Sequence, residues 1–372
     1  MRDSIRRTWP ALCAALLLAC GGGGGEAASS PASVVVVQPP VVDGATPASA
    51  QARATAVALA RGINFGNMLE GPNEGDWGLR VEDEFIALIG DAAHGGFTSA
   101  VRLPVRWSNH ASTDAQAQID PTFMARVDSV ITKLLARGAT VLLDMHHYRQ
   151  LDGDALDTGE ARVADAVVQD RFVAMWRQIA SHFTGFAPQL VFELYNEPHG
   201  SLSPQWNALL ARTLPVVRAS NPSRVVVIGP VQWNSAFELP NLKLPADANL
   251  VLTVHNYEPF NFTHQGASWI RPVMPTGVDC CDAKQLSKMA APLDVARAES
   301  LRRNVPVFVG EFGAYSAGAA DARVRFLNAS RQAMADRGLP WIYWELASGF
   351  GLYDPAAHQF LTVLKDALYA TP

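Results

Sequence analysis

The sequence predicts an α/β fold, a single (β/α)8 TIM barrel preceded by an N-terminal signal and a flexible tether. From residue 61 onward, short apolar runs alternate with longer amphipathic segments, and this alternation is typical of a parallel sheet flanked by helices. Eight apolar runs can be counted, which favours a closed barrel over a doubly wound open sheet. The chain has 372 residues, and a typical barrel needs about 250, so one domain with an N-terminal extension fits.

The predicted strands are short and rich in Val, Ile, Leu and Phe, as expected for buried parallel strands. They span residues 62–67, 99–104, 140–145, 190–195, 224–228, 250–255, 305–310 and 340–344. Predicted helices span residues 81–94, 121–137, 164–183, 204–220 and 320–337, and Gly138 and Gly338 are helix stops. Only the fifth connection is unclear, because Pro240 and Pro245 crowd it. The first strand lacks the glycine-rich phosphate loop expected of an open nucleotide-binding sheet.

The N-terminus predicts export. In residues 1–20, three Arg precede an apolar run that is too short to span a membrane, which is the layout of a secretory signal. The run ends in Leu17-Leu-Ala-Cys20, which resembles a bacterial lipobox and predicts lipidation of Cys20; an ordinary cleaved signal is the alternative. Residues 21–52 are rich in Gly, Ala, Ser and Pro and predict a linker, so the barrel is expected over residues 53–372. We expect a lipoprotein on the cell surface, the outer membrane or the periplasmic face, or otherwise a secreted protein.

The composition limits the classes of partner that the protein can bind. The net charge is −5 and no long Lys/Arg run occurs, which argues against a nucleic-acid partner. We expect membrane contact only through the lipid anchor, a monomer and no cofactor. Cys280 and Cys281 are adjacent and lack zinc-site spacing, so they form either a vicinal disulfide or two free thiols.

Polar and aromatic side chains gather where the predicted strands end, and in a barrel these ends build one site. Asn67 and Glu70 follow the first strand and Arg102 lies in the second. The other strands contribute Asp144, His146, His147, Tyr195, Asn196, Glu197, His255, Asn256, Tyr257, Glu311, Trp344 and Glu345. The start of a loop explains an Asp or Asn well, but it explains two Glu, two His and an Arg poorly.

Glu197 and Glu311 follow the fourth and seventh strands and therefore face each other across the predicted barrel mouth. Two carboxyl groups beside a glycosidic bond are the requirement for glycoside hydrolysis, one protonated and the other ionised. Arg102 and Tyr257 are expected to favour the ionised form of Glu311 by charge and hydrogen bonding. We expect Asn196 to hold a sugar 2-hydroxyl, and Trp344 to form the floor beneath the reacting sugar.

From Arg61 to its C-terminus the chain resembles glycoside hydrolase family 5, and most closely the bacterial endoglucanases of that family that also cut mannan. The resemblance rests on several motifs in order. They are Arg61-Gly-Ile-Asn-Phe-Gly-Asn67, Glu70-Gly-Pro-Asn-Glu-Gly-Asp-Trp77, Val101-Arg-Leu-Pro104, Asp144-Met-His-His147, Leu194-Tyr-Asn-Glu-Pro198, His255-Asn-Tyr-Glu-Pro-Phe260, Phe262-Thr-His-Gln-Gly-Ala267, Gly310-Glu-Phe-Gly313 and Tyr343-Trp-Glu345.

The resemblance implies a retaining endo-β-1,4-glycanase with Glu197 as acid/base and Glu311 as nucleophile, acting on β-1,4-glucan and possibly on mannan. It also implies a cis peptide between Trp344 and Glu345. The remaining active-site positions it implies are Arg102, His146, Asn196, His255, Tyr257 and Trp344. Sugar contacts are implied for His147, Asn67, Glu70 and Glu345, and Trp233 is expected to line the cleft.

Three alternatives remain open. One is an exo-acting β-glucosidase or β-mannosidase, and another is a catalytically silent carbohydrate-binding surface lipoprotein. A third is a metal-dependent hydrolase using His146 and His147; no metal is expected, because adjacent strand residues point to opposite faces. Glu193 and Asp144 are interpreted as buried structural residues, Glu193 as a partner of Arg102.

Overall fold

The computed structural model describes residues 41–42 and 46–369. The predicted signal with Cys20, residues 21–40 and 43–45 of the predicted linker, and residues 370–372 lie outside this part of the chain. Within the described ranges, no helix is long and apolar enough to cross a membrane.

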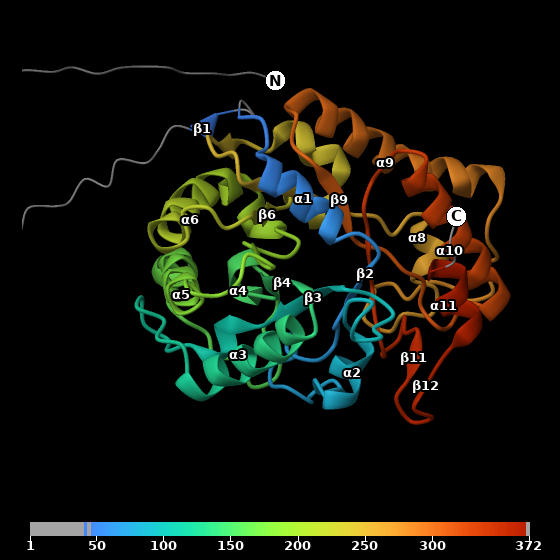
Figure 1. Ribbon diagram of the computed structural model, residues 1–372, viewed down its shortest axis with the longest axis horizontal. Coiled ribbons are helices and arrows are strands. Elements are labelled where there is room, and N and C mark those ends of the chain that lie inside the picture. Colours follow the sequence, from blue (N-terminus) through green and yellow to red (C-terminus); the bar gives the residue numbers. More distant parts are fainter. Residues whose placement is uncertain (1–40, 43–45, 370–372) are drawn as a thin grey trace, which may run out of the picture. The chain divides into compact units, whose positions relative to one another are not determined.

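Eight parallel strands form the barrel in the order β10-β2-β3-β4-β5-β6-β8-β9 (Figure 1). A parallel bridge between Val309 of β9 and Trp341, which immediately precedes β10, closes the circle. The predicted barrel is therefore confirmed. The strands span Gly62–Asn64 (β2), Ala100–Val105 (β3), Thr140–Met145 (β4), Leu190–Glu193 (β5), Val226–Ile228 (β6), Leu250–His255 (β8), Val307–Glu311 (β9) and Ile342–Tyr343 (β10).

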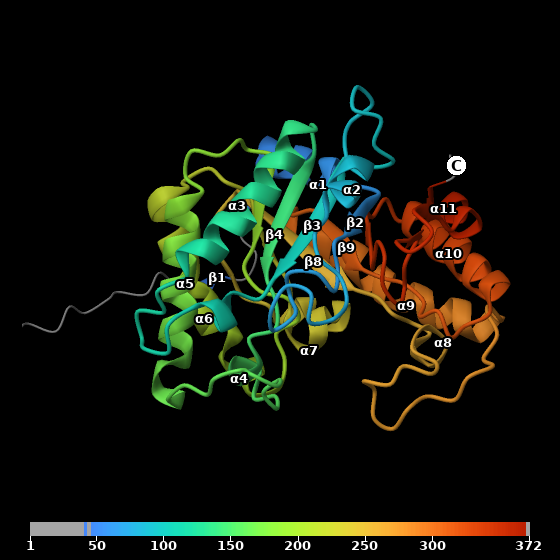
Figure 2. The same ribbon diagram turned by 90° about the horizontal axis from the view of Figure 1, so that it is seen from below.

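Helices surround the strands, with α3, α5 and α6 on one side and α9, α10 and α11 on the other (Figure 2). The longer helices are α3 (Pro121–Ala136), α5 (Val168–His182), α6 (Trp206–Ser220), α9 (Ala283–Arg303), α10 (Ala320–Ala335) and α11 (Thr362–Tyr369). The shorter elements are η1 (Trp107–His110), α4 (Arg149–Asp152), η2 (Asp165–Val167), η3 (Gly200–Gln205), α8 (Phe260–Thr263), β11 (Tyr353–Asp354) and β12 (Gln359–Phe360).

Several predicted bounds need correction. The first strand ends at Asn64 instead of residue 67, and the chain then turns, with a φ of +63° at Asn67. Helix α2 (Asp83–Leu88) is shorter than predicted, because Ile89 leaves the helical conformation and bridges to Thr98. Short elements fill the unclear fifth connection: α7 (Val231–Asn234), η4 (Ala236–Asn241) and β7 (Leu244–Pro245).

Helix α1 (Ala50–Ala58) closes one end of the barrel. Ser49 caps it by accepting a hydrogen bond from the Ala52 backbone, and the Ser49 hydroxyl donates to Asn249 at 2.6 Å. The helix crosses the predicted boundary at residue 53, so the folded chain begins earlier than expected. Strand β1 (Val41–Val42), within the predicted linker, pairs with β7.

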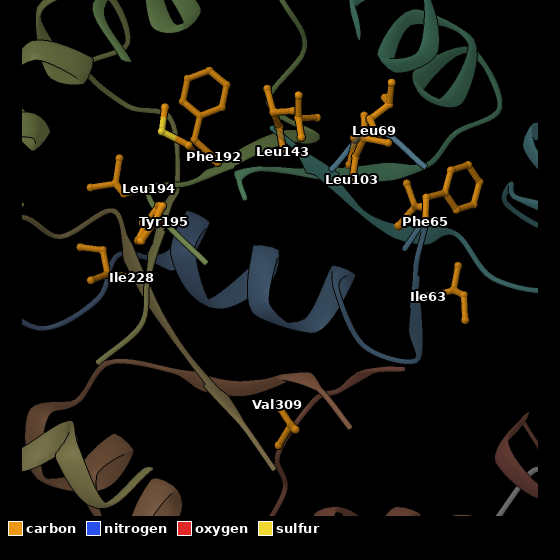
Figure 3. Packing of buried hydrophobic residues seen from close by; sticks show 14 of the residues in the cluster. Ile63, Phe65, Leu69, Leu103, Leu143, Phe192, Leu194, Tyr195, Ile228 and Val309 are labelled. Atoms are coloured by element: carbon orange, nitrogen blue, oxygen red, sulfur yellow. The ribbon is translucent and has the colours of Figure 1, made fainter. Parts of the chain in front are cut away.

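Strand alternation divides the apolar side chains into two clusters. One cluster joins Ala52 and Ala56 of α1, and Leu59 at its C-cap, to inward-facing strand residues such as Leu142 and Val191. Their neighbours on the same strands belong to the larger cluster that packs under the helices, some of whose residues are drawn around the blue α1 ribbon in Figure 3. Because α1 fills the barrel at this end, an open site can form only at the opposite, C-terminal ends of the strands.

Candidate active site

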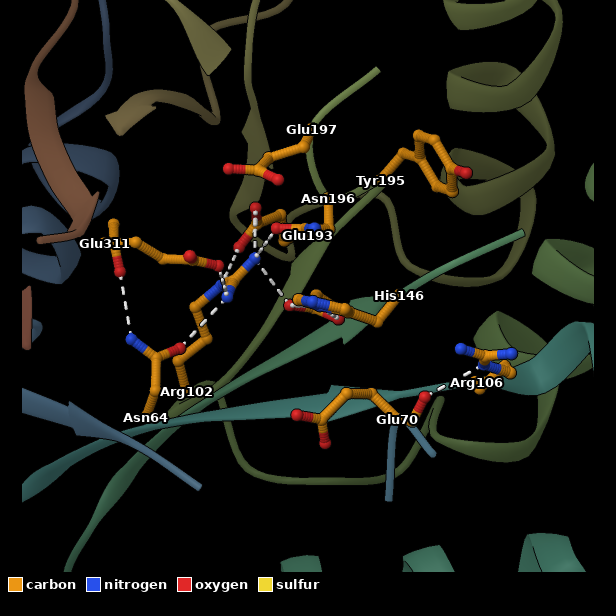
Figure 4. Close-up of polar contacts among 12 residues, drawn as sticks. Asn64, Glu70, Arg102, Arg106, His146, Glu193, Tyr195, Asn196, Glu197 and Glu311 are labelled. Carbon is orange, nitrogen blue, oxygen red and sulfur yellow. Dashed lines mark hydrogen bonds and ion pairs between the residues drawn. The ribbon is translucent and has the colours of Figure 1, made fainter. Parts of the chain in front are cut away.

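The predicted site residues converge at the C-terminal ends of the strands (Figure 4). Arg102 lies on β3, His255 ends β8 and Glu311 ends β9. Asn196 and Glu197 follow β5 after a two-residue extension of the chain. The close-up shows Asn196, Glu197 and Glu311 gathered around the guanidinium of Arg102.

Arg102 organises the site and is fully buried. Its guanidinium contacts three carboxylates, at 2.7 Å for Glu193, 2.6 Å for Asp144 and 2.7 Å for Glu311. It also donates to the side-chain oxygens of Asn196 at 2.8 Å and Asn64 at 3.0 Å. The expected buried pair of Arg102 and Glu193 is therefore present. One cation thus neutralises part of a strongly negative cluster, since buried charges need such partners.

Glu311 is held by two donors that favour its ionised form. One carboxylate oxygen accepts from Arg102, and the other accepts from the Tyr257 hydroxyl at 2.8 Å. Asn64 of β2 fixes the adjacent backbone by donating to the Gly310 carbonyl at 3.1 Å. Hydrogen bonds and a positive charge at a carboxylate stabilise the charged state, so these contacts suit a nucleophile.

Glu197 has a different environment. Its side chain is 23% exposed, whereas that of Glu311 is 5% exposed, so Glu197 faces the open mouth of the barrel. Its carboxyl accepts from the Nδ1–H of His255 at 2.7 Å. The Nε2 of that imidazole accepts from Asn234 at 3.2 Å, which places the proton on Nδ1. Burial lowers the pKa of His255, so a neutral ring faces Glu197.

The two glutamates form an interacting pair. One carboxylate oxygen of each lies within 4.8 Å of the other, and of a ring nitrogen of His255. Burial raises the pKa of both to about 7. Because two negative charges would repel each other, the second proton leaves the pair only at a raised pH. The two donors at Glu311 favour its ionised form, so the hydrogen bonding suits a pair in which Glu311 ionises first and Glu197 keeps the remaining proton.

Aromatic rings line the site beside this pair. The His146 ring lies nearly parallel to that of Trp344, with centroids 5.8 Å apart, and its Nδ1 contacts both oxygens of Asp144 at 3.2 Å. His147 makes an edge contact with Trp77, whose ring also packs against Arg106. Burial holds the pKa of both histidines well below its usual range, so both are neutral.

The predicted sugar contacts Glu70 and Glu345 are fully buried and accept hydrogen bonds from backbone amides. Glu70 binds the amides of Asn67 and Met68, and Glu345 binds those of Ala347, Ser348 and Phe350. Burial raises the pKa of Glu70 to about 8 and that of Glu345 to about 7. Both carboxyls therefore shape the two loops that carry Asn67 and Ser348, which bond to each other at 2.7 Å. The peptide between Trp344 and Glu345 is cis, as the resemblance implied.

Trp233 is 52% exposed, and its ring stacks on that of His199 at 4.7 Å. It lies in a stretch of three residues with positive φ, from Gln232 to Asn234. Asn64, Asn234 and His199 were not predicted as site residues from the sequence. Of these three residues, only His199 could have been predicted from the sequence, because it lies two residues after Glu197.

Cys280 and Cys281 are joined as a vicinal disulfide, which is one of the two states left open by the sequence. Among the described residues, Glu197, His255 and Glu311 are the one cluster of at least three metal-ligating side chains close enough to hold a cation. His146 and His147 are not part of it. This cluster is the carboxyl pair together with the His255 ring that bonds Glu197, so the arrangement of the pair already explains why the three side chains lie together.

Two adjacent carboxyl groups at the mouth of a barrel are the arrangement that glycoside hydrolysis requires, so the fold and the site together fit a glycoside hydrolase. The chain belongs to the cellulase family, glycosyl hydrolase family 5, which matches residues 67–349. The enzyme class expected from the sequence is confirmed.

Among curated relatives, Endoglucanase H of Acetivibrio thermocellus is 31% identical over 318 residues, covering 84% of this chain and 33% of the relative. Endoglucanase 3 of Fibrobacter succinogenes is 24% identical, covering 80% of this chain and 50% of the relative. The chain thus spans a third to a half of the length of these relatives. Endoglucanase A of Ruminococcus albus is 26% identical, covering 79% of this chain and 85% of the relative.

Solved structures match the whole barrel. A hyperthermophilic endo-β-1,4-glucanase in complex with substrate has a TM-score of 0.79 and 34% identity, covering 86% of this chain and 99% of that one. Cel5A of Thermotoga maritima in complex with mannotriose has a TM-score of 0.78 and 35% identity, covering 85% and 99%. The same enzyme has been solved with cellobiose, again with a TM-score of 0.78.

Proposed function

We propose that the protein is a retaining endo-β-1,4-glucanase that also hydrolyses β-1,4-mannan. The observation that carries this proposal is the Glu197–Glu311 pair with carboxylate oxygens within 4.8 Å of each other. Retaining glycosidases hold their carboxyls ~5–5.5 Å apart, whereas inverting enzymes need ~6.5–9.5 Å to admit a water. The separation and the unequal hydrogen-bond partners both fit a double displacement.

In the first step, Glu311 attacks the anomeric carbon while Glu197 gives its proton to the glycosidic oxygen. That oxygen leaves with the bonding electrons, and a glycosyl ester forms on Glu311. In the second step, the ionised Glu197 removes a proton from water, and the water oxygen displaces the Glu311 carboxylate. Two displacements at the same carbon return the original anomeric configuration.

Four side chains would assist these steps. Arg102 and Tyr257 stabilise the Glu311 carboxylate before attack and again when it leaves. Asn196, held by Arg102, lies beside Glu197 where it can bond a sugar 2-hydroxyl. Trp344, stacked against His146, offers an apolar face to the reacting ring.

Support for both glucan and mannan comes from the comparisons. Cel5A of Thermotoga maritima, 35% identical to this chain, has been solved with cellobiose and with mannotriose. Glucose and mannose differ only in the configuration of the 2-hydroxyl, so one cleft can accept both where no side chain blocks either position. Endo action on the internal bonds of a polymer fits the endoglucanase relatives.

The proposal also includes export as a lipid-anchored protein, supported by the lipobox-like residues before Cys20 and the apolar run preceding them. Labelling producing cells with radioactive palmitate tests it. Label should appear in the wild-type chain and be lost in Cys20→Ser. A Cys20→Ser protein that stays labelled, or a wild type without label, would refute the lipid anchor.

The deciding experiment is hydrolysis by the purified protein of carboxymethyl-cellulose, barley β-glucan, glucomannan, mannan and xylan. We expect reducing-sugar release from the first four, a fast fall in viscosity that marks endo cleavage, and loss of activity in Glu311→Ala. Glu238→Ala, which removes an acidic side chain from η4, is the matched control and should stay active. NMR of the first product should show the β-anomer. A folded but inactive wild type, or an initial α-anomer, would overturn the proposal.

A further inference from the structure

We propose that His199 is a positioning residue that holds the acid/base Glu197 by its backbone carbonyl and keeps a positive charge beside it. The inference rests on the proposed double displacement, in which Glu197 must be protonated first and ionised second. It assigns a role to a histidine that the sequence analysis did not select.

The first observation is a contact to the backbone of Glu197. His199 Nδ1 lies 2.6 Å from the Glu197 carbonyl oxygen, which can only accept, so Nδ1 carries a proton. Glu197 has a φ of +49°, in the left-handed region that residues other than glycine rarely occupy. Such a backbone persists only where neighbours hold it. The imidazole therefore fixes the unusual turn that aims the Glu197 side chain.

The second observation is that the other ring nitrogen also faces an acceptor. His199 Nε2 lies 3.2 Å from an oxygen of Asp154, and Asp152 places a carboxylate oxygen 3.7 Å from Nδ1. With a proton on each nitrogen the ring is an imidazolium. Burial opposes this charge, but the contacts with Asp154 and Asp152 outweigh it and raise the pKa of His199 to about 9.

The acidic side chains around His199 are themselves held in place. Asp152 accepts from the Tyr195 hydroxyl and from the His199 backbone amide. Asp154 is paired with Arg149 at 3.2 Å. Burial raises the pKa of Asp152 to about 7, whereas the hydrogen bond from His199 lowers that of Asp154. Asp154, whose hydrogen bond is the largest of the contributions that raise the pKa of His199, is therefore the main partner of the charged ring.

The charged groups that face Glu197 act in opposite directions. His199 lowers the pKa of Glu197 more than any other charge does, and Arg102 lowers it next, while Glu193 and Asp144 raise it. Glu311 is the remaining acid within reach, and His255 bonds Glu197 as a neutral ring. A cation favours the ionised carboxylate, so loss of the imidazolium must raise the pKa of Glu197.

The same imidazole also supports the cleft. The Trp233 ring lies on it at 4.7 Å with an angle of 21° between planes, which is a cation–π geometry. Trp233 presents its other side to solvent. His199 thus joins the acid/base to an exposed aromatic surface, and its removal should affect substrate affinity as well as turnover.

His199→Gln, a neutral replacement, tests the inference. We expect the alkaline limb of kcat/KM on 4-nitrophenyl β-cellobioside to move upward by about 1 pH unit, and kcat on the plateau to fall roughly tenfold. Asp154→Asn keeps the imidazole but removes the charged partner of Nε2. The alkaline limb of this variant should therefore move in the same direction, but by a smaller amount. The matched control is His182→Gln, which removes the His182–Asp128 pair of 2.8 Å on α5 and α3; it should change neither limb.

The effect of His199 on Glu197 can also be measured without any turnover of substrate. The pKa of Glu197 can be followed by 13C NMR of glutamate-labelled protein, with the signal assigned from Glu197→Gln. A wild type inactive on every glycan would refute the proposed function, yet the shift in His199→Gln would still be measured. If Glu197 titrates at the same pH in wild type, His199→Gln and Asp154→Asn, the inference is wrong. If His199→Gln fails to fold, Asp154→Asn decides alone.

Discussion

Replacing Tyr257 with Phe isolates one of the two contacts that favour the ionised form of Glu311. The hydroxyl donates to one Glu311 oxygen at 2.8 Å, while Arg102 holds the other oxygen and remains in the variant. A hydrogen bond to a charged group contributes roughly 1.5–3 kcal/mol. Since one pKa unit corresponds to about 1.4 kcal/mol, Tyr257→Phe should raise the pKa of Glu311 by about 1–2 units.

The consequence is measurable in the pH profile of kcat/KM on 4-nitrophenyl β-cellobioside. The acid limb reports ionisation of the nucleophile, so it should move upward by about 1–2 pH units. Below the limb, activity should fall by about 10–100-fold, with a smaller loss on the plateau. Tyr343→Phe, which loses a 2.7 Å bond to the Phe350 carbonyl, is the matched control. An acid limb that does not move in Tyr257→Phe would refute the assignment of Glu311 as the ionised partner.

Three further predictions follow from the same structure. Arg102→Met leaves the carboxylates around it without their cation, and we expect thermal or urea unfolding to show a loss of about 3–5 kcal/mol; a stable, active variant would contradict the central role of this guanidinium. Leu59→Ala opens a cavity beneath α1 and should lower the free energy of unfolding by about 2–5 kcal/mol, with kcat unchanged. A loss of kcat in the folded variant would show that α1 influences the site. Excess EDTA should leave hydrolysis unchanged, because Glu197 and Glu311 fill both catalytic roles; inactivation reversed by a divalent metal would support the metal-dependent alternative.

The strands were predictable from the sequence because buried parallel strands read as apolar runs, and β4 and β8 have the predicted bounds. Helix α1 was not predictable in the same way. It is rich in Ala, as is the preceding segment, and its burial arises from strands far along the chain, such as Val251 of β8. Composition cannot distinguish an Ala-rich linker from an Ala-rich helix that fills a barrel end.

The convergence of the site residues was predictable because strand ends in a barrel share one face. The buried pairing of Arg102 with Glu193 also followed from strand parity. The inward turn of Glu70 and Glu345 onto backbone amides was not predictable, since it depends on the path of two loops. His199 escaped notice because its partners Asp152 and Asp154 lie in a separate loop that the sequence does not connect to it.

The unequal roles proposed for the two glutamates rest on their hydrogen-bond partners, since both carboxyls have a pKa of about 7, raised mainly by burial. Arg102 favours the charged form of Glu311, but it also serves Glu193 and Asp144, so its charge is shared among three carboxylates. Those two acids in turn raise the pKa of Glu197. Both acids are fully buried, and their charge adds to the burial of Glu197 in favouring its protonated form. An apolar replacement of either acid would free the guanidinium for Glu311 and remove a negative charge near Glu197, so both carboxyls would ionise at lower pH and the pH range in which acid and nucleophile coexist would move down.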